Sequence, residues 1–178
     1  MKPLDKKDLA IIGAFPTDND EWTVLDVGCG RGRISYHLAA MGYHVYATDI
    51  SKRIATNKLK FYQADIFDMG SFPIKESPMV ICSEVLEHLK NYKKALSNLL
   101  ALATSRLIIT VPCRNAFSHP GHCNHWADKA TSKFLDINEF AELCKPYKTT
   151  ISKIIAKPQD EGKQYAYLIV IDKKQKSA

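Results

Sequence analysis

The stretch Val24–Ser35 reads VLDVGCGRGRIS and places Gly28, Gly30 and Gly32 at alternate positions behind Asp26. Glycine loses much conformational entropy on folding and adds no side chain to a core. Three glycines in five residues therefore indicate that the backbone conformation at this position requires them. An apolar run precedes them and an amphipathic run follows them, which predicts a strand, a tight turn and a helix. We expect a turn of this kind to let a ligand approach the main chain closely.

The helix after this turn is expected to present Ile34, Leu38 and Met41 to a sheet and to end at Gly42. The free N–H groups at its start can receive an anion. The dinucleotide fingerprint GxGxxG would require glycine at position 33, where this chain has Arg33. The spacing therefore argues against a nucleotide diphosphate as the ligand.

Short segments rich in Val, Ile and Tyr recur along the chain and predict seven strands. Helical spacing of apolar residues is clearest between Val85 and Leu100. Alternating strands and helices predict a doubly wound α/β fold with a mostly parallel sheet. The segment between the last two strands, which contains KPQDEGK, is too short for a crossover helix, so we expect these strands to form an antiparallel C-terminal hairpin at the sheet's edge. The expected strands are residues 23–28, 43–50, 60–66, 78–84, 106–112, 149–156 and 165–172.

Length and composition indicate one globular domain over residues 1–178. Apolar residues make up 46% and charged residues 25%, as is usual for soluble proteins. No apolar run is long enough to span a bilayer, and Asp5 and Asp8 stand where a signal peptide would carry no acid. We therefore predict no transmembrane segment and a cytoplasmic location. The five cysteines form no CxxC pair, which favours reduced thiols and no disulfide.

The formal net charge of +6 permits an anionic partner without indicating one. Part of the excess lies in residues 173–178, which we expect to be a frayed basic tail.

The pattern Asp-x-Gly-x-Gly-x-Gly resembles motif I of the class I methyltransferases that use S-adenosylmethionine. In that family the glycine loop packs against the amino-acid end of the cofactor. The match continues in order along the chain. Asp49 ends the second expected strand, where the family binds both ribose hydroxyls. Asp65 ends the third, where the family places a carboxylate on the adenine amino group and the N–H of the next residue, here Ile66, on a ring nitrogen.

The fourth expected strand ends in ICSEVLEHL, which is similar to the corresponding segment of many small methyltransferases. The resemblance covers about Val24 to Pro112 and implies a Rossmann-like methyltransferase fold in a small, minimal member. It implies S-adenosylmethionine as co-substrate. The implied cofactor-binding residues are Asp26, Gly28, Cys29, Gly30, Gly32, Asp49, Ile50, Asp65, Ile66 and Ser83.

Two segments carry candidate chemistry for the acceptor. Glu84, Glu87 and His88 would share one face if their segment were helical. We predict His88 as a base or acceptor ligand that Glu87 orients. His125 belongs to a His-rich stretch in residues 112–135, which we expect to be a substrate loop.

The Glu-x-x-Glu-His set also resembles the metal site of methyltransferases that modify the terminal 2′-hydroxyl of small RNAs. Glu84, Glu87 and His88 would then bind Mg²⁺ or Mn²⁺ with His122, or alternatively His125, as a distant ligand. EVLEHL also occurs in metal-free relatives, including quinone-pathway enzymes, so we favour the metal-free interpretation. A zinc site using Cys113 and Cys123 is disfavoured because the spacings match no familiar finger.

The resulting prediction is an S-adenosylmethionine-dependent methyltransferase that moves a methyl group to an unidentified acceptor by in-line displacement. Residues 1–20 are expected to form a short helix over the cofactor, which leaves an open mouth and favours a large or surface-presented acceptor. A small metabolite is the main competitor. Two other functions stay open: a metal-assisted 2′-O-methyltransferase acting on an RNA 3′ end, and a non-catalytic cofactor-binding partner subunit. The oligomeric state is left open.

Overall fold

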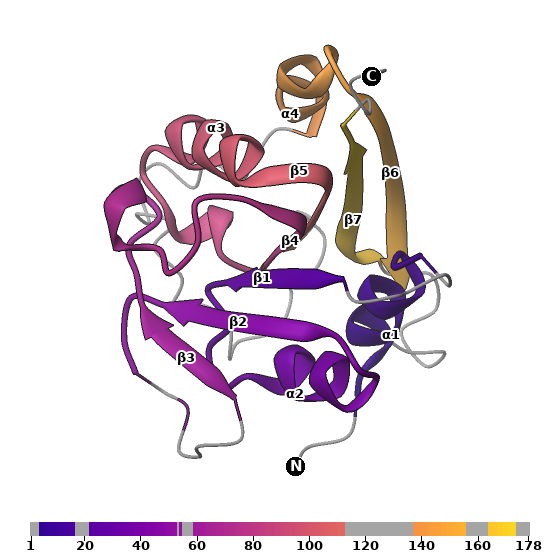
Figure 1. Cartoon of the computed structure of the whole chain (residues 1–178). Helices are drawn as coiled ribbons and strands as arrows, with labels where there is room; N and C mark the ends of the chain where they lie inside the picture. Colours follow the sequence, from indigo (N-terminus) through magenta and orange to yellow (C-terminus); the bar gives the residue numbers. More distant parts are fainter. Residues whose placement is uncertain are drawn as a thin grey trace, which may run out of the picture.

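A computed structural model describes residues 4–16, 22–52, 54, 59–112, 137–155 and 164–173. The elements of this part of the chain are drawn in Figure 1. The strands are β1 (Thr23–Val27), β2 (His44–Asp49), β3 (Lys60–Gln63), β4 (Ser77–Ser83), β5 (Ala103–Pro112), β6 (Lys148–Ile155) and β7 (Gln164–Asp172). The helices are α1 (Lys6–Gly13), α2 (Arg33–Ala40), α3 (Tyr92–Leu102) and α4 (Ile137–Cys144), with 3₁₀ turns η1 (Met69–Ser71) and η2 (Leu86–His88).

The strands form one sheet in the order β3-β2-β1-β4-β5-β7-β6. The first five strands are parallel, and β7 runs antiparallel to both β5 and β6. The predicted fold class is therefore confirmed, including the antiparallel pair at the C-terminal end. The order reverses between β1 and β4, so their carboxyl ends flank the crevice in which α/β sheets bind ligands.

Helices cover both faces of the sheet, and the central strands β1 and β4 are buried on both sides. On one face, Leu25 and Val27 of β1 join a core cluster completed by α3 and α4. On the other face, Val24 joins a cluster completed by α1 and α2, as the two layers in Figure 1 show. Because successive strand side chains point to opposite faces, a central strand between two helical layers must be apolar on both.

Two local predictions from the sequence are wrong. Met41 does not face the sheet: it caps the C-terminus of α2 and is 47% exposed. The helical pattern from Val85 to Leu100 is not one helix, because Leu89 is extended and the side chain of Asn91 caps the start of α3. An Asn cap accepts from the first free N–H groups, which fixes the helix start there.

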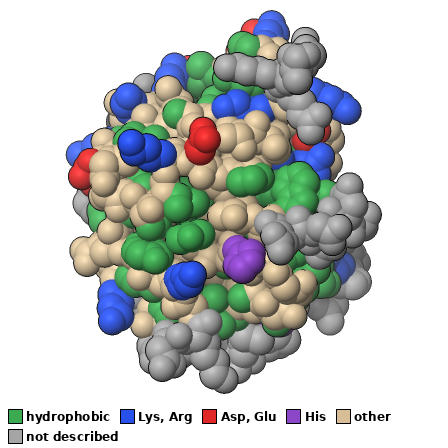
Figure 2. Space-filling model, viewed as in Figure 1, with side chains coloured by type: hydrophobic (Ala, Val, Ile, Leu, Met, Phe, Trp, Pro, Cys, Tyr) green, Lys and Arg blue, Asp and Glu red, His purple; other side chains and the backbone are tan. Residues whose placement is uncertain are grey.

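The basic tail differs from the sequence-based expectation at its first residue. Lys173 Nζ donates to Leu100 O and Ala103 O at the end of α3. Residues 174–178 lie outside the described residues. On the face drawn in Figure 2, Lys and Arg side chains stand apart from one another.

Of the cysteines, Cys29, Cys82 and Cys144 are free thiols, while Cys113 and Cys123 lie outside the described residues. Within the described ranges, none of the helices has the length and apolar character that a membrane crossing requires.

Candidate active site

The glycine loop between β1 and α2 is built from three left-handed glycines. Gly28, Gly30 and Gly32 have φ angles of 75°, 56° and 74°. The N–H groups of Gly28 and Cys29 both donate to Thr48 O, at 2.8 and 2.9 Å, which ties the loop to the end of β2. This backbone region is costly for other L-residues, so the glycines are required by conformation.

The three glycines differ in what surrounds them. A Cβ on Gly28 would lie 2.3 Å from Val85 Cγ2, and one on Gly32 would lie 3.0 Å from Ile54 Cδ1. A Cβ on Gly30 would meet no atom of the described residues within 4 Å. Packing accounts for two of the glycines, whereas the middle one leaves its main chain open to approach.

Asp49 links this loop to the carboxyl end of β2. Its Oδ2 accepts from the N–H of Gly30 at 2.9 Å, and its Oδ1 accepts from the N–H of Ser51 at 3.0 Å. Oδ1 also accepts from Ser51 Oγ at 3.4 Å. A carboxylate oxygen has about two lone-pair directions, so Oδ2 is the oxygen that keeps capacity for a ligand hydroxyl group. Ile50, the next residue, is 64% exposed beside it.

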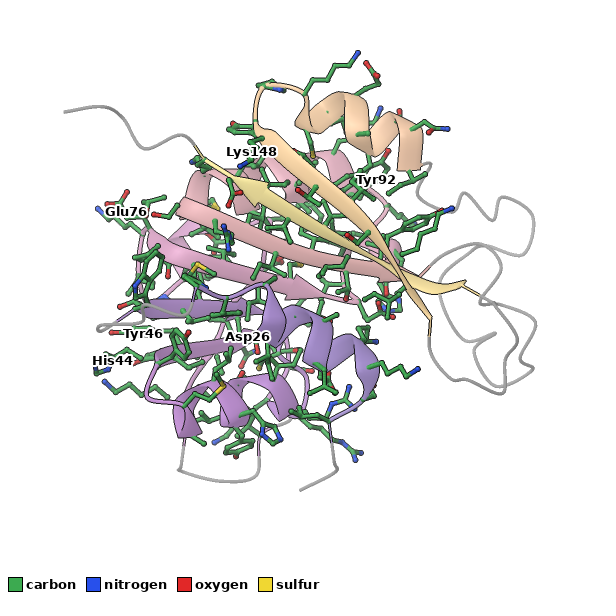
Figure 3. The ribbon with its side chains drawn as sticks, turned by 90° about the vertical axis from the view of Figure 1, so that its right-hand side faces the viewer. Asp26, His44, Tyr46, Glu76, Tyr92 and Lys148 are labelled. Atoms are coloured by element: carbon green, nitrogen blue, oxygen red, sulfur yellow. The ribbon has the colours of Figure 1, made fainter. Side chains whose placement is uncertain are left out.

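Asp26 lies beneath the loop and not at its surface. It is 3% exposed, and Ser35 Oγ donates to its Oδ2 at 2.5 Å. Figure 3 shows it in the interior, away from the rim where His44 and Tyr46 lie. Burial raises the pKa of Asp26 to about 6, the Ser35 hydrogen bond opposes this rise and the charge of Asp49 adds to it. Burial and the same two acids raise the pKa of the Cys29 thiol, which keeps it protonated.

The turn after β3 leaves one amide donor unused. Asp65 N donates to Ser71 Oγ, and Asp65 Oδ1 accepts from Phe67 N, both at 2.9 Å. Asp65 O accepts from Asp68 N at 2.9 Å. Within the described part of the chain, the N–H of Ile66 has no acceptor.

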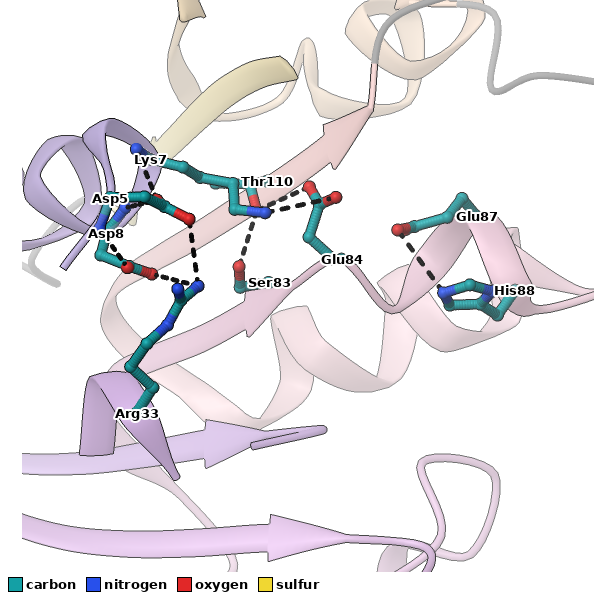
Figure 4. A network of polar contacts seen from close by, with 9 residues as sticks. All are labelled: Asp5, Lys7, Asp8, Arg33, Ser83, Glu84, Glu87, His88 and Thr110. Atoms are coloured by element: carbon teal, nitrogen blue, oxygen red, sulfur yellow. Dashed lines mark hydrogen bonds and ion pairs between the residues drawn. The ribbon is translucent and has the colours of Figure 1, made fainter. Parts of the chain in front are cut away.

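The end of β4 carries a second polar group, drawn in Figure 4. Ser83 Oγ and Thr110 Oγ1 are hydrogen-bonded at 2.8 Å, and Thr110 Oγ1 contacts Glu84 Oε1 at 3.2 Å. Glu84 has a φ of 56°, a left-handed conformation that is uncommon without glycine. The turned backbone directs its carboxylate toward α1, where Lys7 Nζ lies 3.4 Å from Oε2.

Sequence reasoning missed Lys7. Its side chain is only 8% exposed, which is rare for a lysine without a functional or ionic partner. The available signal was its position four residues before Ile11, on the buried face of α1. Helix α1 is also fixed to the start of α2, because Arg33 Nη2 lies 3.2 Å from Asp5 and 3.0 Å from Asp8.

Glu87 and His88 lie together on η2. Glu87 Oε1 is 3.7 Å from His88 Nε2, and Figure 4 shows the two side chains turned toward each other. The Glu87 side chain is 12% exposed, and its buried Oε2 has no hydrogen-bond partner among the residues that the structure describes. Burial, together with the charge of Glu84, raises the pKa of Glu87 to about 8. Such a carboxylic acid can exchange a proton near neutral pH.

The three predicted metal ligands that the structure describes, Glu84, Glu87 and His88, are not gathered into one site. Glu84, Glu87 and His88 do not share a helix face, because Glu84 lies before η2 and turns to Lys7. In the ranges that the structure describes, no group of three His, Cys, Asp or Glu side chains is placed to hold a metal ion. These three described side chains therefore do not fit a divalent ion as they stand. The predicted residues His122 and His125 lie outside the described residues.

The geometry agrees with comparisons to known proteins. Residues 7–150 match the family described as a methyltransferase domain. The chain belongs to this methyltransferase family. Within it, the chain is 34% identical over 93 residues to a ubiquinone biosynthesis O-methyltransferase of Rickettsia conorii, a match that covers 47% of this chain and 32% of that protein. The chain thus spans about a third of that relative's length.

Solved methyltransferases share the fold across almost the whole chain. An S-adenosylmethionine-dependent methyltransferase from Archaeoglobus fulgidus has a TM-score of 0.69 at 18% identity, covering 94% of this chain and 93% of its own. The methyltransferase domain of a bacterial CtHen1 has a TM-score of 0.70 at 14% identity, covering 94% and 98%. These likenesses show the methyltransferase fold.

Proposed function

We propose that the chain binds S-adenosylmethionine and transfers its methyl group to an acceptor oxygen. The observation that carries this proposal is the open main chain at Gly30, beside the Asp49 carboxylate, in a chain of the methyltransferase family. In a nucleoside that carries an amino-acid arm, the ribose hydroxyls would bind the carboxylate and the arm would lie against the open backbone. Fold alone would not carry an activity, so the proposal rests on this site.

We assign one group of the described chain to each part of the cofactor. Asp49 would accept from the ribose hydroxyls, with Ile50 beside the base. Asp65 and the unused N–H of Ile66 would meet the edge of adenine. Asp26 supports the loop from beneath, with Gly28, Cys29 and Gly32 shaping it and Ser83 at the facing strand end.

Lys7 and Glu84 offer opposite charges for the methionine end of the cofactor. Their ion pair is long at 3.4 Å, and both groups lie where α1 meets the end of β4. An α-carboxylate would pair with the lysine ammonium, and an α-ammonium with the glutamate. This exchange keeps every buried charge paired, which avoids a large desolvation cost.

The cofactor supplies an electrophilic methyl group on a sulfonium, so the protein's task is chiefly to align the acceptor. A hydroxyl acceptor also has a proton to lose. Glu87, with its raised pKa and buried Oε2, would accept this proton directly or through His88. The oxygen acceptor is suggested by the name of the rickettsial relative. Whether the acceptor is small or surface-presented stays a prediction, as does a role for His125.

Two experiments test this proposal. Isothermal titration should show 1:1 binding of S-adenosylmethionine and of S-adenosylhomocysteine. A methyl-radiolabelled cofactor should then label a hydroxyl acceptor in a screen of phenols, lipids, RNA and protein. Binding without any labelled acceptor would instead support the non-catalytic partner subunit, and label confined to RNA 3′ ends with a metal requirement would support the metal-assisted alternative.

A further inference from the structure

Asn98 is a buried polar residue on the apolar face of α3. It is 5% exposed, and its neighbours on that face, among them Ala95, Leu99 and Leu102, are fully buried apolar residues. Its Nδ2 donates to Ile66 O at 2.7 Å, across 32 residues of sequence. A buried amide is tolerated only when it is hydrogen-bonded, and an apolar residue would bury more hydrophobic surface there. The amide therefore fixes the position of the Ile66 carbonyl.

The segment that Asn98 holds is anchored from several sides. The Ile66 side chain is 7% exposed and packs in the same core as α3. The preceding residue is bound through Asp65 N and O to Ser71 and Asp68. The Ile66 carbonyl accepts from Asn98, whereas the Ile66 N–H has no acceptor among the described residues. The polar contacts of this turn thus hold the Ile66 N–H in place as a donor for a ligand.

We propose that Asn98 is a positioning residue that aims the Ile66 N–H at the adenine ring and so selects adenine over a 6-oxo purine. This inference rests on the proposed function, because it assumes that a nucleoside binds beside Ile66. Adenine presents an unprotonated ring nitrogen beside its amino group, which accepts from an N–H. Hypoxanthine carries a hydrogen on that nitrogen and would oppose the Ile66 N–H with a second donor. A rigidly held donor discriminates more sharply than a mobile one, because a mobile one can turn away.

The test compares S-adenosylhomocysteine with S-inosylhomocysteine by isothermal titration in the wild type and in Asn98→Leu. Asn98→Leu removes the hydrogen bond at similar volume. We expect the wild type to prefer the adenine ligand by at least about tenfold. In Asn98→Leu the affinity for the adenine ligand should fall about tenfold, while the affinity for the inosine ligand changes little. The ratio of the two affinities should therefore fall about tenfold, and any preference that remains is the part that the Asp65 carboxylate contributes at the 6-position.

Leu99→Val on the same helix is the matched control, because it disturbs packing without touching the Ile66 carbonyl. It should leave the ratio of the two affinities unchanged. Equal weakening of both ligands in Asn98→Leu would show that Asn98 is merely structural and would overturn the inference. A wild type that binds neither ligand would instead refute the proposed function.

A measurement on the wild type keeps the inference testable if Asn98→Leu does not fold. In ¹⁵N-labelled protein, the Ile66 amide proton should move downfield when S-adenosylhomocysteine is added, and less when S-inosylhomocysteine is added. Equal shifts with the two ligands would contradict the inference.

Discussion

At the scale of single residues, one glycine of the loop differs from its neighbours in a way that the motif does not reveal. Gly28 and Gly32 have side chains close to where a Cβ would lie, whereas no described side chain comes within 4 Å of that position at Gly30. All three have positive φ. A side chain at Gly30 would therefore fill space that the fold itself leaves open, and the most direct consequence is for ligand binding.

Gly30→Val should abolish binding of S-adenosylhomocysteine while leaving the far-ultraviolet circular dichroism near wild type. The side chain would occupy the open approach to the loop. Gly42→Val is the matched control, because Gly42 also has positive φ and open surroundings. Both variants carry backbone strain of about 1–3 kcal/mol. Normal affinity in Gly30→Val, or equal loss in both variants, would show that the ligand lies elsewhere.

Asp26 should make the free protein less stable as pH rises through the range from about 4 to about 6. Its folded pKa of about 6 lies above the ordinary aspartate pKa of 3.8, so the folded state holds its proton more tightly than the unfolded state. The stabilisation is present below the unfolded pKa and lost as pH rises through the folded one, on the order of 3 kcal/mol.

Urea unfolding of wild type and Asp26→Asn at several pH values measures this loss. The stability difference between the two proteins should change between pH 4 and 7, with the wild type losing more. In Ser35→Ala the free energy of unfolding should fall by more between pH 4 and 7 than it does in the wild type, because the Ser35 hydrogen bond lowers the pKa of Asp26. A difference that does not vary with pH would contradict the assignment.

Glu87 should give the methyl transfer a rise in rate through about pH 8. Burial and the charge of Glu84 raise its pKa to about 8, and a base acts only when ionised. With an acceptor from the screen, Glu87→Gln should lower kcat and remove this rise, while S-adenosylhomocysteine affinity changes little. A Glu87→Gln profile that keeps the same rise would assign the proton transfer to another group.

At the scale of elements, ionic contacts fix α1 over the junction of α2 and β4. Arg33 pairs with Asp5 and with the fully buried Asp8, and Lys7 pairs with Glu84. The apolar side of α1 contributes Ile11 to the core. The short helix thus has both an apolar and a charged attachment, and the charged one reaches the candidate site.

Arg33→Met should loosen α1, because it removes the cation that faces the buried Asp8 carboxylate. Hydrogen exchange of the α1 amides should accelerate about tenfold, while the exchange of β5 and β7 stays unchanged. Lys145→Met removes an exposed pair with Glu142 and serves as control, since such surface pairs contribute little. Unchanged α1 exchange in Arg33→Met would mean that apolar packing alone holds the helix.

Elements also show where sequence patterns stop being informative. Apolar spacing predicted a helix from Val85 onward, but the pattern cannot register the Asn91 cap or the left-handed backbone of Glu84. These two features separate Glu84 from Glu87 and His88. The periodic pattern therefore does not reveal the break in the helix or the separation of Glu84 from Glu87.

At the scale of the whole molecule, the sequence was most informative where strand ends meet. The resemblance to the methyltransferase family implied Asp49, Asp65 and the glycine loop as cofactor-binding groups, and in the folded chain they lie at or just after the ends of parallel strands, whose carboxyl ends meet at one edge of the sheet. Contacts between distant segments carry no such local signal. The Lys7–Glu84 ion pair and the Asn98–Ile66 hydrogen bond arise only when α1 and α3 pack on the sheet.

The most direct test of the central claim is the isothermal titration of S-adenosylhomocysteine into wild type and Asp49→Ala. We predict 1:1 binding to the wild type and a weakening of at least about tenfold in Asp49→Ala, since hydrogen bonds to a charged group are worth about 1.5–3 kcal/mol. S-adenosylmethionine should weaken by the same factor, because the ribose is remote from the transferred methyl group. No binding to the wild type, or a change below about 0.5 kcal/mol in Asp49→Ala, would contradict the claim that this site holds the cofactor.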